Sequence, residues 1–205
     1  MIHPRSQTGL LCGLWLFCFC SAPLSPQNSD SSPLNTTGSI NINGRLTPYL
    51  IRHLPVSSFP NLPLAIQQQL SQRDCLIPQT YEAHEPENVV RASFERATSS
   101  DWAVLCSSQG TVSLLVFFGG GSSPPFTLAS SPETERVQSH GSTGALGFDW
   151  AIDPASPQDV HEAQVGMRRP PPRLDHDALA DSVIDQRAVY HFYSNGTWTL
   201  VDTQD

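Results

Sequence analysis

Short apolar runs separated by polar turns mark the second half of the chain. Residues 101–107 and 111–118 are two such runs, and Ser108-Gln109-Gly110 joins them. Runs rich in β-forming residues around a glycine-containing turn predict a hairpin. The uninterrupted apolar stretch 114–118 is typical of a strand that is buried on both faces. We therefore expect this hairpin to form the centre of the core.

The last hydrophobic segment, residues 188–201, gives the clearest local signal. Asn195-Gly196 is the preferred pair for a type I′ turn and lies between aromatic and β-branched residues. A two-residue turn pairs Tyr193 with Trp198, and His191 with Leu200, on one face of the hairpin. We expect His191 to be a buried core residue with one fixed hydrogen-bond partner; the alternative is a ligand or a general base.

The remaining elements have weaker patterns. Residues 64–73 predict a helix, with Pro63 near its first turn. Residues 88–94 and 147–152 predict short strands. The stretch 119–147 has the composition of a long polar loop, and residues 153–187 that of a loop leading into one or two helical turns. The expected fold is α+β and mainly β, with one antiparallel sheet of five or six strands and one packed helix.

The N-terminal pattern predicts export. Arg5 precedes an apolar run, residues 10–22, that ends in small residues and is short for a membrane span. A buried N-terminal helix is the alternative. The Pro-, Ser- and Asn-rich stretch that follows keeps no helical or strand period. We divide the chain into a signal peptide (1–22), a disordered linker arm (23–60) and a single globular domain (61–205), and expect a secreted or periplasmic protein.

The cysteines fit this compartment. Three of the five lie in the apolar run, which leaves Cys75 and Cys106 in the mature chain. A lone pair in an oxidising compartment predicts a disulfide, while two buried thiols or a nucleophilic Cys106 are the alternatives. Asn35-Thr36-Thr37 and Asn195-Gly196-Thr197 match the glycosylation sequon.

Composition removes several classes of function. The formal net charge is −8, and all eleven basic residues are arginine. Without lysine the chain has no Schiff-base lysine and no P-loop phosphate site. An acidic chain with scattered arginines lacks the positive surface that nucleic acid or anionic lipid requires. We expect no nucleic-acid partner and no membrane span.

Two groups of residues are candidates for a site. Asp175, His176 and Asp177 carry metal-ligating side chains, but neighbouring residues of a strand point in opposite directions. A solvated acidic turn with Asp177 near the N-cap of a following helix is the alternative. Trp102, Trp150 and Trp198 could line a ligand groove or pack in the core. The sequence indicates no cofactor.

Residues 94–115 resemble a single FG-GAP or VCBS-type repeat, the unit of integrin-like β-propellers. Phe94 stands seven residues before Asp101, which opens the segment DWAV, and residues 110–115 (GTVSLL) keep the outgoing strand. The acidic calcium loop of such repeats retains only Glu95 and Asp101 here, whereas Ca²⁺ takes six or more oxygen ligands. The secreted layout, with DCLIPQ at residues 74–79 and DWAVLC at 101–106, is also similar to short exported bacterial proteins of unknown function, a likeness that implies no activity.

The patterns together favour an exported, non-enzymatic binding or envelope-associated protein. Edge strands with exposed aromatic residues are able to take a partner, either a protein or an envelope component. The alternative is a hydrolase or metal-dependent enzyme that uses Asp175, His176 and Asp177, with His191 from the last hairpin.

Overall fold

The expected central hairpin is present in the computed structural model, which describes residues 34–141, 144–186 and 188–203. Strand β5 (Asp101–Ser108) pairs antiparallel with β6 (Thr111–Phe117) through a turn at Gln109 and Gly110. Seven consecutive residues of β5 are buried. This pattern arises because alternate side chains face two different layers: Trp102, Val104 and Cys106 on one side, Ala103 and Leu105 on the other.

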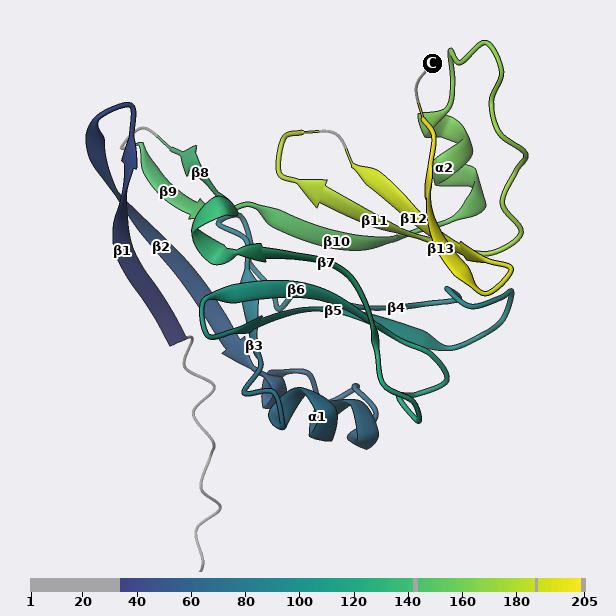
Figure 1. The fold of residues 1–205 in the computed structure, drawn as a ribbon, viewed down its shortest axis with the longest axis horizontal. Coiled ribbons are helices and arrows are strands. Elements are labelled where there is room, and N and C mark those ends of the chain that lie inside the picture. The colour runs from purple at the N-terminus through teal and green to yellow at the C-terminus, as the bar shows by residue number, and fades with distance from the viewer. Residues whose placement is uncertain (1–33, 142–143, 187, 204–205) are drawn as a thin grey trace, which may run out of the picture. The chain divides into compact units, whose positions relative to one another are not determined.

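The described residues form two β-sheets and two α-helices (Figure 1). The large sheet has the order β7-β6-β5-β3-β2-β9-β8, with β1 paired to β2 and β4 paired to β5. It is mixed, because β2 and β9 run parallel. Its other strands are β1 (Leu34–Ile42), β2 (Arg45–Pro55), β3 (Leu76–Gln79), β4 (Val89–Ala92), β7 (Phe126–Pro132), β8 (Val137–His140) and β9 (Ala145–Phe148).

The small sheet has the order β10-β11-β12-β13 and is antiparallel throughout. Its strands are β10 (Trp150–Ala155), β11 (Ala178–Val183), β12 (Val189–Ser194) and β13 (Thr197–Val201). The helices are α1 (Leu64–Ser71) and α2 (Pro157–Ala163), and short 3₁₀ turns lie at Val56–Ser58 and Glu133–Glu135.

The expectation of one antiparallel sheet with five or six strands is wrong. The described residues contain a nine-stranded mixed sheet and a separate four-stranded sheet. The extra strands come from three stretches that lack strong hydrophobic periods. Residues 34–55, assigned to the linker arm, form β1 and β2. Residues 126–147, assigned to a polar loop, form β7, β8 and most of β9. Residues 178–183, assigned to a helical turn, form β11.

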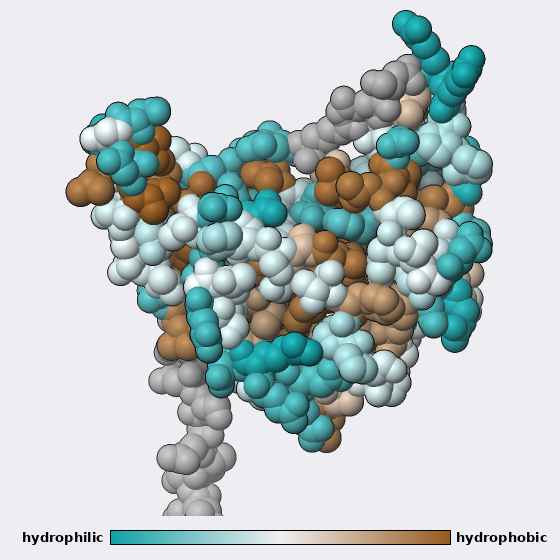
Figure 2. All heavy atoms as spheres, viewed as in Figure 1, coloured by the Kyte–Doolittle hydropathy of each residue, from teal (hydrophilic) through white to brown (hydrophobic). Residues whose placement is uncertain are grey.

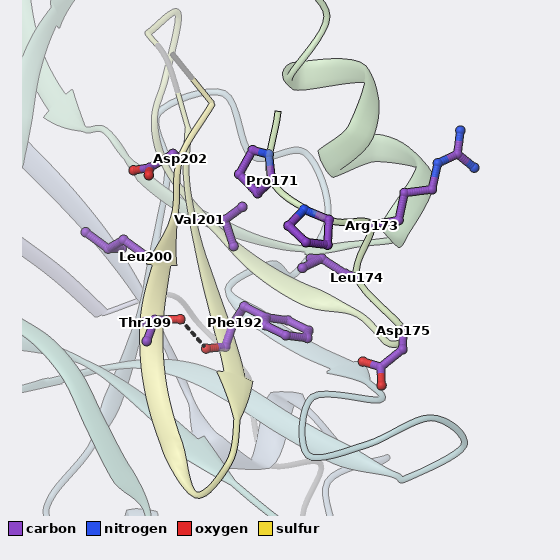
Figure 3. Close-up of a pocket in the computed structure, with 10 residues that line it drawn as sticks. Pro171, Arg173, Leu174, Asp175, Phe192, Thr199, Leu200, Val201 and Asp202 are labelled. Carbon is purple, nitrogen blue, oxygen red and sulfur yellow. Dashed lines mark hydrogen bonds between the residues drawn. The ribbon is translucent and has the colours of Figure 1, made fainter. Parts of the chain in front are cut away.

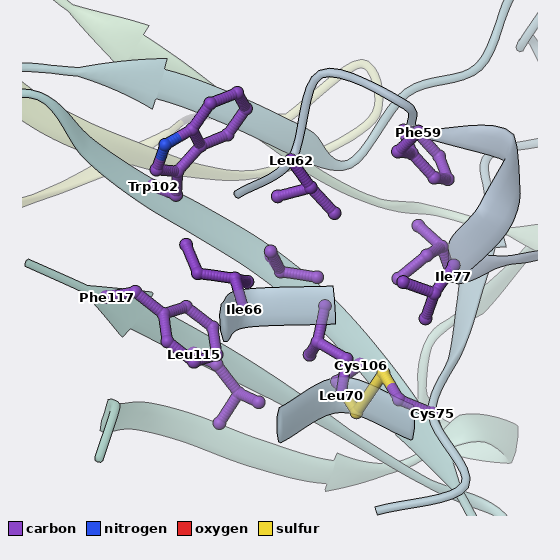
Figure 4. Packing of buried hydrophobic residues seen from close by; sticks show 12 residues of the cluster. Phe59, Leu62, Ile66, Leu70, Cys75, Ile77, Trp102, Cys106, Leu115 and Phe117 are labelled. Carbon is purple, nitrogen blue, oxygen red and sulfur yellow. A yellow bond between two sulfur atoms is a disulfide. The ribbon is translucent and has the colours of Figure 1, made fainter. Parts of the chain in front are cut away.

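The apolar side chains form three clusters, each between two layers. One lies between α1 and the large sheet and includes Ile66, Leu70 and Phe117 (Figure 4). The second lies between the two sheets and includes Phe94 and Trp150. The third lies where α2 covers the small sheet. The predicted helix at 64–73 is therefore present and packed, but each sheet also covers one face of the other.

Cys75 and Cys106 lie at disulfide distance, with their Cα atoms 5.3 Å apart (Figure 4). Cys75 follows α1, and Cys106 lies in β5. Both side chains are buried in the cluster beneath α1. The pair therefore joins the end of the helix to the central hairpin, as the sequence predicts.

The predicted signal peptide, residues 1–22, lies outside the described residues, as does the beginning of the predicted linker arm. Among the described residues, no helix has the length and apolar character needed to cross a bilayer.

Candidate functional site

A groove of about 500 Å³ lies beside the hairpin that β12 and β13 form (Figure 3). The type I′ turn of this hairpin has positive φ at Asn195 and Gly196, and its register pairs Tyr193 with Trp198, as predicted. The opposite wall is the proline-rich segment that precedes β11. The lining residues are Pro171, Pro172, Arg173, Leu174, Asp175, Phe192, Thr199, Leu200, Val201 and Asp202.

The inner surface of this groove is mainly apolar. Phe192 and Leu174 point into the space between the hairpin and the proline-rich segment, whereas the side chain of Arg173 points away from it (Figure 3). The same two apolar residues pack against the cluster beneath α2. An apolar cleft with a few polar groups at its rim is the usual form of a ligand site. The sequence singled out Asp175 here but none of the apolar residues.

His176 holds one end of the groove in place. Its Nδ1 lies 2.7 Å from Oδ1 of Asp175, and its Nε2 lies 3.0 Å from the main-chain oxygen of Tyr193. Its ring packs on Phe192 with 4.4 Å between ring centroids. Both ring nitrogens are thus occupied by partners within the fold, and the imidazole fixes the proline-rich segment to β12.

The other candidate ligand, Asp177, faces a different part of the molecule. Its Oδ2 accepts a hydrogen bond of 3.0 Å from the main-chain N–H of Ser93. Asp177 directly precedes β11, so the helix that it was expected to cap is absent from this part of the structure. Within the described ranges, no three His, Cys, Asp or Glu side chains form a group that could hold a metal ion. The enzyme alternative stays a prediction from the sequence.

The three candidate tryptophans have different environments. Trp150 is fully buried between the sheets, where its Nε1 donates a hydrogen bond of 2.6 Å to Oδ1 of Asp181. Trp102 is also mainly buried, but it lines a second groove, of about 590 Å³, with the guanidinium of Arg91 5.9 Å from its ring centroid. Trp198 is half-buried.

Trp198 belongs to an aromatic cluster that the sequence did not reveal. Its partners are Tyr193, at 5.4 Å between ring centroids, Phe118, at 6.0 Å, and Phe126, at 6.5 Å. Phe126 is 40% exposed. The indole Nε1 of Trp198 is buried and has no hydrogen-bond partner in the described part of the chain. Phe118 and Phe126 lie far from Trp198 in sequence, so only the packing of the hairpin on the large sheet brings them together.

His191 is half-buried in β12, the first strand of the last hairpin. Its Nε2 lies 3.1 Å from Oδ2 of Asp181, and both side chains are largely shielded from solvent. One ring nitrogen of His191 therefore has the predicted partner within the fold, while the residue itself is half-buried at the margin of the core. The carboxylate of Asp181 contacts both His191 and Trp150, so it joins β10, β11 and β12.

A buried polar cluster lies on the large sheet, where Nε2 of His53 is 2.7 Å from Oε1 of Glu133. The hydroxyl of Ser107 donates to the same oxygen. Burial raises the pKa of Glu133, but hydrogen bonds from His53 and Ser107 outweigh it, so the pKa is lowered from its ordinary value. Because Ser107 contacts the carboxylate and not the imidazole, the arrangement differs from a nucleophile–base pair.

Asp101, the best-matched acidic position of the resemblance to a calcium-loop repeat, is fully buried. Its Oδ2 accepts from the N–H of Glu95, at 2.8 Å, and from the hydroxyl of Ser99, while its Oδ1 accepts from the N–H of Gly119, at 3.0 Å. Glu95 pairs with Arg96. The carboxylate of Asp101 thus organises its own loop through donor groups of the chain.

Comparison with family models, with curated proteins and with solved structures gave no match to this chain. The groove beside β13 and the aromatic cluster are therefore interpreted from their own geometry.

Proposed function

We propose that this protein is an exported, non-enzymatic polypeptide-binding module that takes up an extended segment of a protein partner along β13. The observation that carries the proposal is the combination of a free strand edge with an apolar groove beside it. Main-chain hydrogen bonds to an edge strand supply affinity in this mode of recognition, and pockets for alternate side chains supply selectivity.

The free edge follows from the register of the last hairpin. Within the described residues β13 pairs with β12 alone. Next to a two-residue turn, Ser194 and Thr197 form a hydrogen-bonded pair, and such pairs alternate along the ladder. The N–H and C=O groups of Trp198 and Leu200 therefore point away from β12. They are available to an added strand.

The chemistry of the partner follows from the groove. β13 (TWTLV) carries no charge, and an uncharged edge lacks the usual protection against strand addition. Leu200 is 61% exposed at this edge. On the neighbouring face, Leu174 and Phe192 line the groove. A partner segment with an apolar side chain at alternate positions fits both features.

The test uses a capped nonapeptide of alternating threonine and leucine with a lysine at each end. We expect binding to shift the amide resonances of Trp198 and Leu200 and to slow their hydrogen exchange. Leu200→Pro removes an outward N–H without touching the β12–β13 bonds, so it should weaken binding roughly tenfold or more. Leu200→Thr keeps the N–H and is the matched control. Absence of shifts, or shifts confined to other strands, would overturn the proposal.

The exported location is tested separately. We expect the full chain, expressed in a bacterial host, to appear in the periplasmic fraction without the apolar run, residues 10–22. Retention of the apolar run in a cytoplasmic product would contradict export and would leave the binding test unaffected.

A further inference from the structure

Strand β1 has an edge that is unusually open to pairing. It lies outermost beside β2 (Figure 1), and in the described residues β2 is its only partner strand. Its nine residues, LNTTGSINI, include no charged residue and no proline. Charges and prolines are the devices by which edge strands avoid adding to another sheet. β1 lacks both.

The register of the β1–β2 hairpin shows which groups face outward. Asn43 and Gly44 form its two-residue turn, both with positive φ, so Ile42 and Arg45 are a hydrogen-bonded pair. Alternation then directs the N–H and C=O groups of residues 35, 37, 39 and 41 away from β2. Pro48 stands opposite Ser39, a position at which its missing N–H costs the β1–β2 ladder nothing.

The sequence of β1 is nearly symmetric about Gly38. When two β1 strands are placed antiparallel about this residue, apolar side chains face apolar ones and polar face polar in all but one pair. The pairs are Leu34 with Ile42, Asn35 with Asn41, Thr36 with Ile40, Thr37 with Ser39, and Gly38 with itself. The outward-facing residues 35, 37, 39 and 41 also oppose one another, which is the condition for a complete ladder.

We infer that two copies of this chain pair through β1, antiparallel about Gly38, so that their large sheets join into one across a twofold axis. A twofold interface must be self-complementary, and the mirrored pattern of β1 meets this condition. A foreign strand would not require a mirrored sequence. The inference is independent of peptide binding at β13.

The distribution of charge along the chain also supports a second copy of this protein as the partner of β1. Both copies are acidic, with a formal net charge of −8, yet residues 31–73 contain no Asp or Glu. The charged residues of the β1–β2 hairpin are Arg45 and Arg52, besides His53. The hairpin itself therefore carries no negative charge that would repel a second acidic copy. Apolar surface is exposed at the tip of this hairpin (Figure 2), where Ile42, the last residue of β1, is 39% exposed.

The experiment measures association by sedimentation velocity from about 1 μM to about 1 mM. The chain is produced in a host without N-glycosylation, because Asn35 begins a sequon. We expect a reversible dimer. Asn35→Lys/Asn41→Lys sets lysine opposite lysine, and Asn35→Asp/Asn41→Asp sets aspartate opposite aspartate. Each double variant alone should dimerise roughly tenfold more weakly or worse, and an equimolar mixture should recover a heterodimer.

Leu46→Lys adds charge to the same hairpin on β2, away from the β1 edge, and should leave the dimer unchanged. A parent chain that stays monomeric would overturn the inference, and so would a dimer that both double variants leave intact. If a variant fails to fold, amide exchange of the parent decides. Protection that increases with concentration at residues 35, 37, 39 and 41 supports pairing through β1, and its absence there contradicts it.

Discussion

The indole Nε1 of Trp150 donates a hydrogen bond of 2.6 Å to Oδ1 of Asp181, a carboxylate whose Oδ2 lies 3.1 Å from Nε2 of His191. One side chain of β11 thus joins the strands on either side of it. Two residues that sequence patterns made candidates for ligand binding or catalysis, Trp150 and His191, are held by this carboxylate inside the fold. Their arrangement predicts effects on stability.

Replacement of Asp181 by alanine should lower the free energy of unfolding by about 1–3 kcal/mol, because it leaves the buried Nε1 of Trp150 without an acceptor. Urea denaturation followed by tryptophan fluorescence measures the change. Ser182→Ala, at the next residue of β11, removes only a long hydrogen bond of 3.3 Å to the oxygen of Ala151 and is the control. Equal midpoints for both variants would contradict the role assigned to Asp181.

His191→Phe should keep the protein folded and lower its stability by roughly 0.5–1.5 kcal/mol, the cost of one lost hydrogen bond. The carboxylate of Asp181 would still accept from Trp150. A thermal melt measures the effect. An unshifted melting temperature, together with loss of a ligand- or metal-induced stabilisation that the parent shows, would identify His191 as a site residue instead.

The two-residue turns explain what sequence reasoning found and what it missed. Asn195-Gly196 predicts β12 and β13 with the correct register because aromatic and β-branched residues flank it. Asn43-Gly44 forms the same turn, with φ of 50° and 84°. Ile40 and Ile42 alternate with Asn41 before this turn, but the polar residues at 35–39 end the alternation in β1, and Pro48 interrupts it in β2. No period of two therefore extends along either strand. The strand pairing of β1 is carried by main-chain bonds, which leave little trace in the sequence.

Strand β11 shows a second reason why the sequence did not reveal part of the fold. Its residues, ALADSV, include good helix formers and follow acidic residues, a pattern typical of a helix start. Pairing with β10 and β12 on both sides overrides this local preference. The groove beside β13 was missed for a related cause: Leu174 and Phe192 meet only once the sheet is assembled. Long-range pairing of this kind cannot be derived from a single sequence.

Stability should fall in acid partly because of Glu133. Its pKa is lowered in the folded state by hydrogen bonds from His53 and Ser107 that outweigh burial. A carboxyl with a lowered pKa stabilises the fold above its ordinary pKa of 4.5, and this contribution is lost as pH falls further. Glu133→Gln should therefore be less stable than the parent at pH 7, by about 1–3 kcal/mol.

Urea titrations at a series of pH values compare the two proteins. The stability difference between parent and Glu133→Gln should shrink as pH falls below about 4.5. Glu135→Gln makes the same carboxylate-to-amide change at an exposed position of the same short turn and is the matched control; it should lose less stability at pH 7. A difference that stays constant with pH would show that the charge of Glu133 does not matter.

Asp149 should have the opposite effect on stability to Glu133: its ionised carboxylate should destabilise the fold. Burial raises its pKa, although the charge of Arg136 lowers it in part, and its Oδ1 has no hydrogen-bond partner among the described residues. Because the pKa of Asp149 is higher in the folded than in the unfolded chain, ionisation of this carboxyl destabilises the fold. The loss of stability grows as pH rises above the ordinary pKa of 3.8. Asp149→Asn should be more stable than the parent at pH 7, and the gain should vanish in acid. A loss of stability at pH 7 would contradict this.

The Cys75–Cys106 pair gives the largest expected effect. The two residues are separated by 31 positions, and closing a loop of this length stabilises a fold by roughly 3–4 kcal/mol when the unfolded chain is constrained. Both side chains are buried beside α1, so the bond also fixes the helix to β5. The double variant Cys75→Ala/Cys106→Ala should lose about this much stability, measured by urea denaturation.

Two controls separate the bond from the packing of the sulfur atoms. Reductant should lower the unfolding midpoint of the parent toward that of the double variant and leave the variant itself unchanged. Intact mass after alkylation under denaturing conditions should show two additional blocked thiols only when the parent has been reduced. Two thiols that alkylate freely in the unreduced, denatured chain would show that the bond is absent, and the stability difference would then come from packing alone.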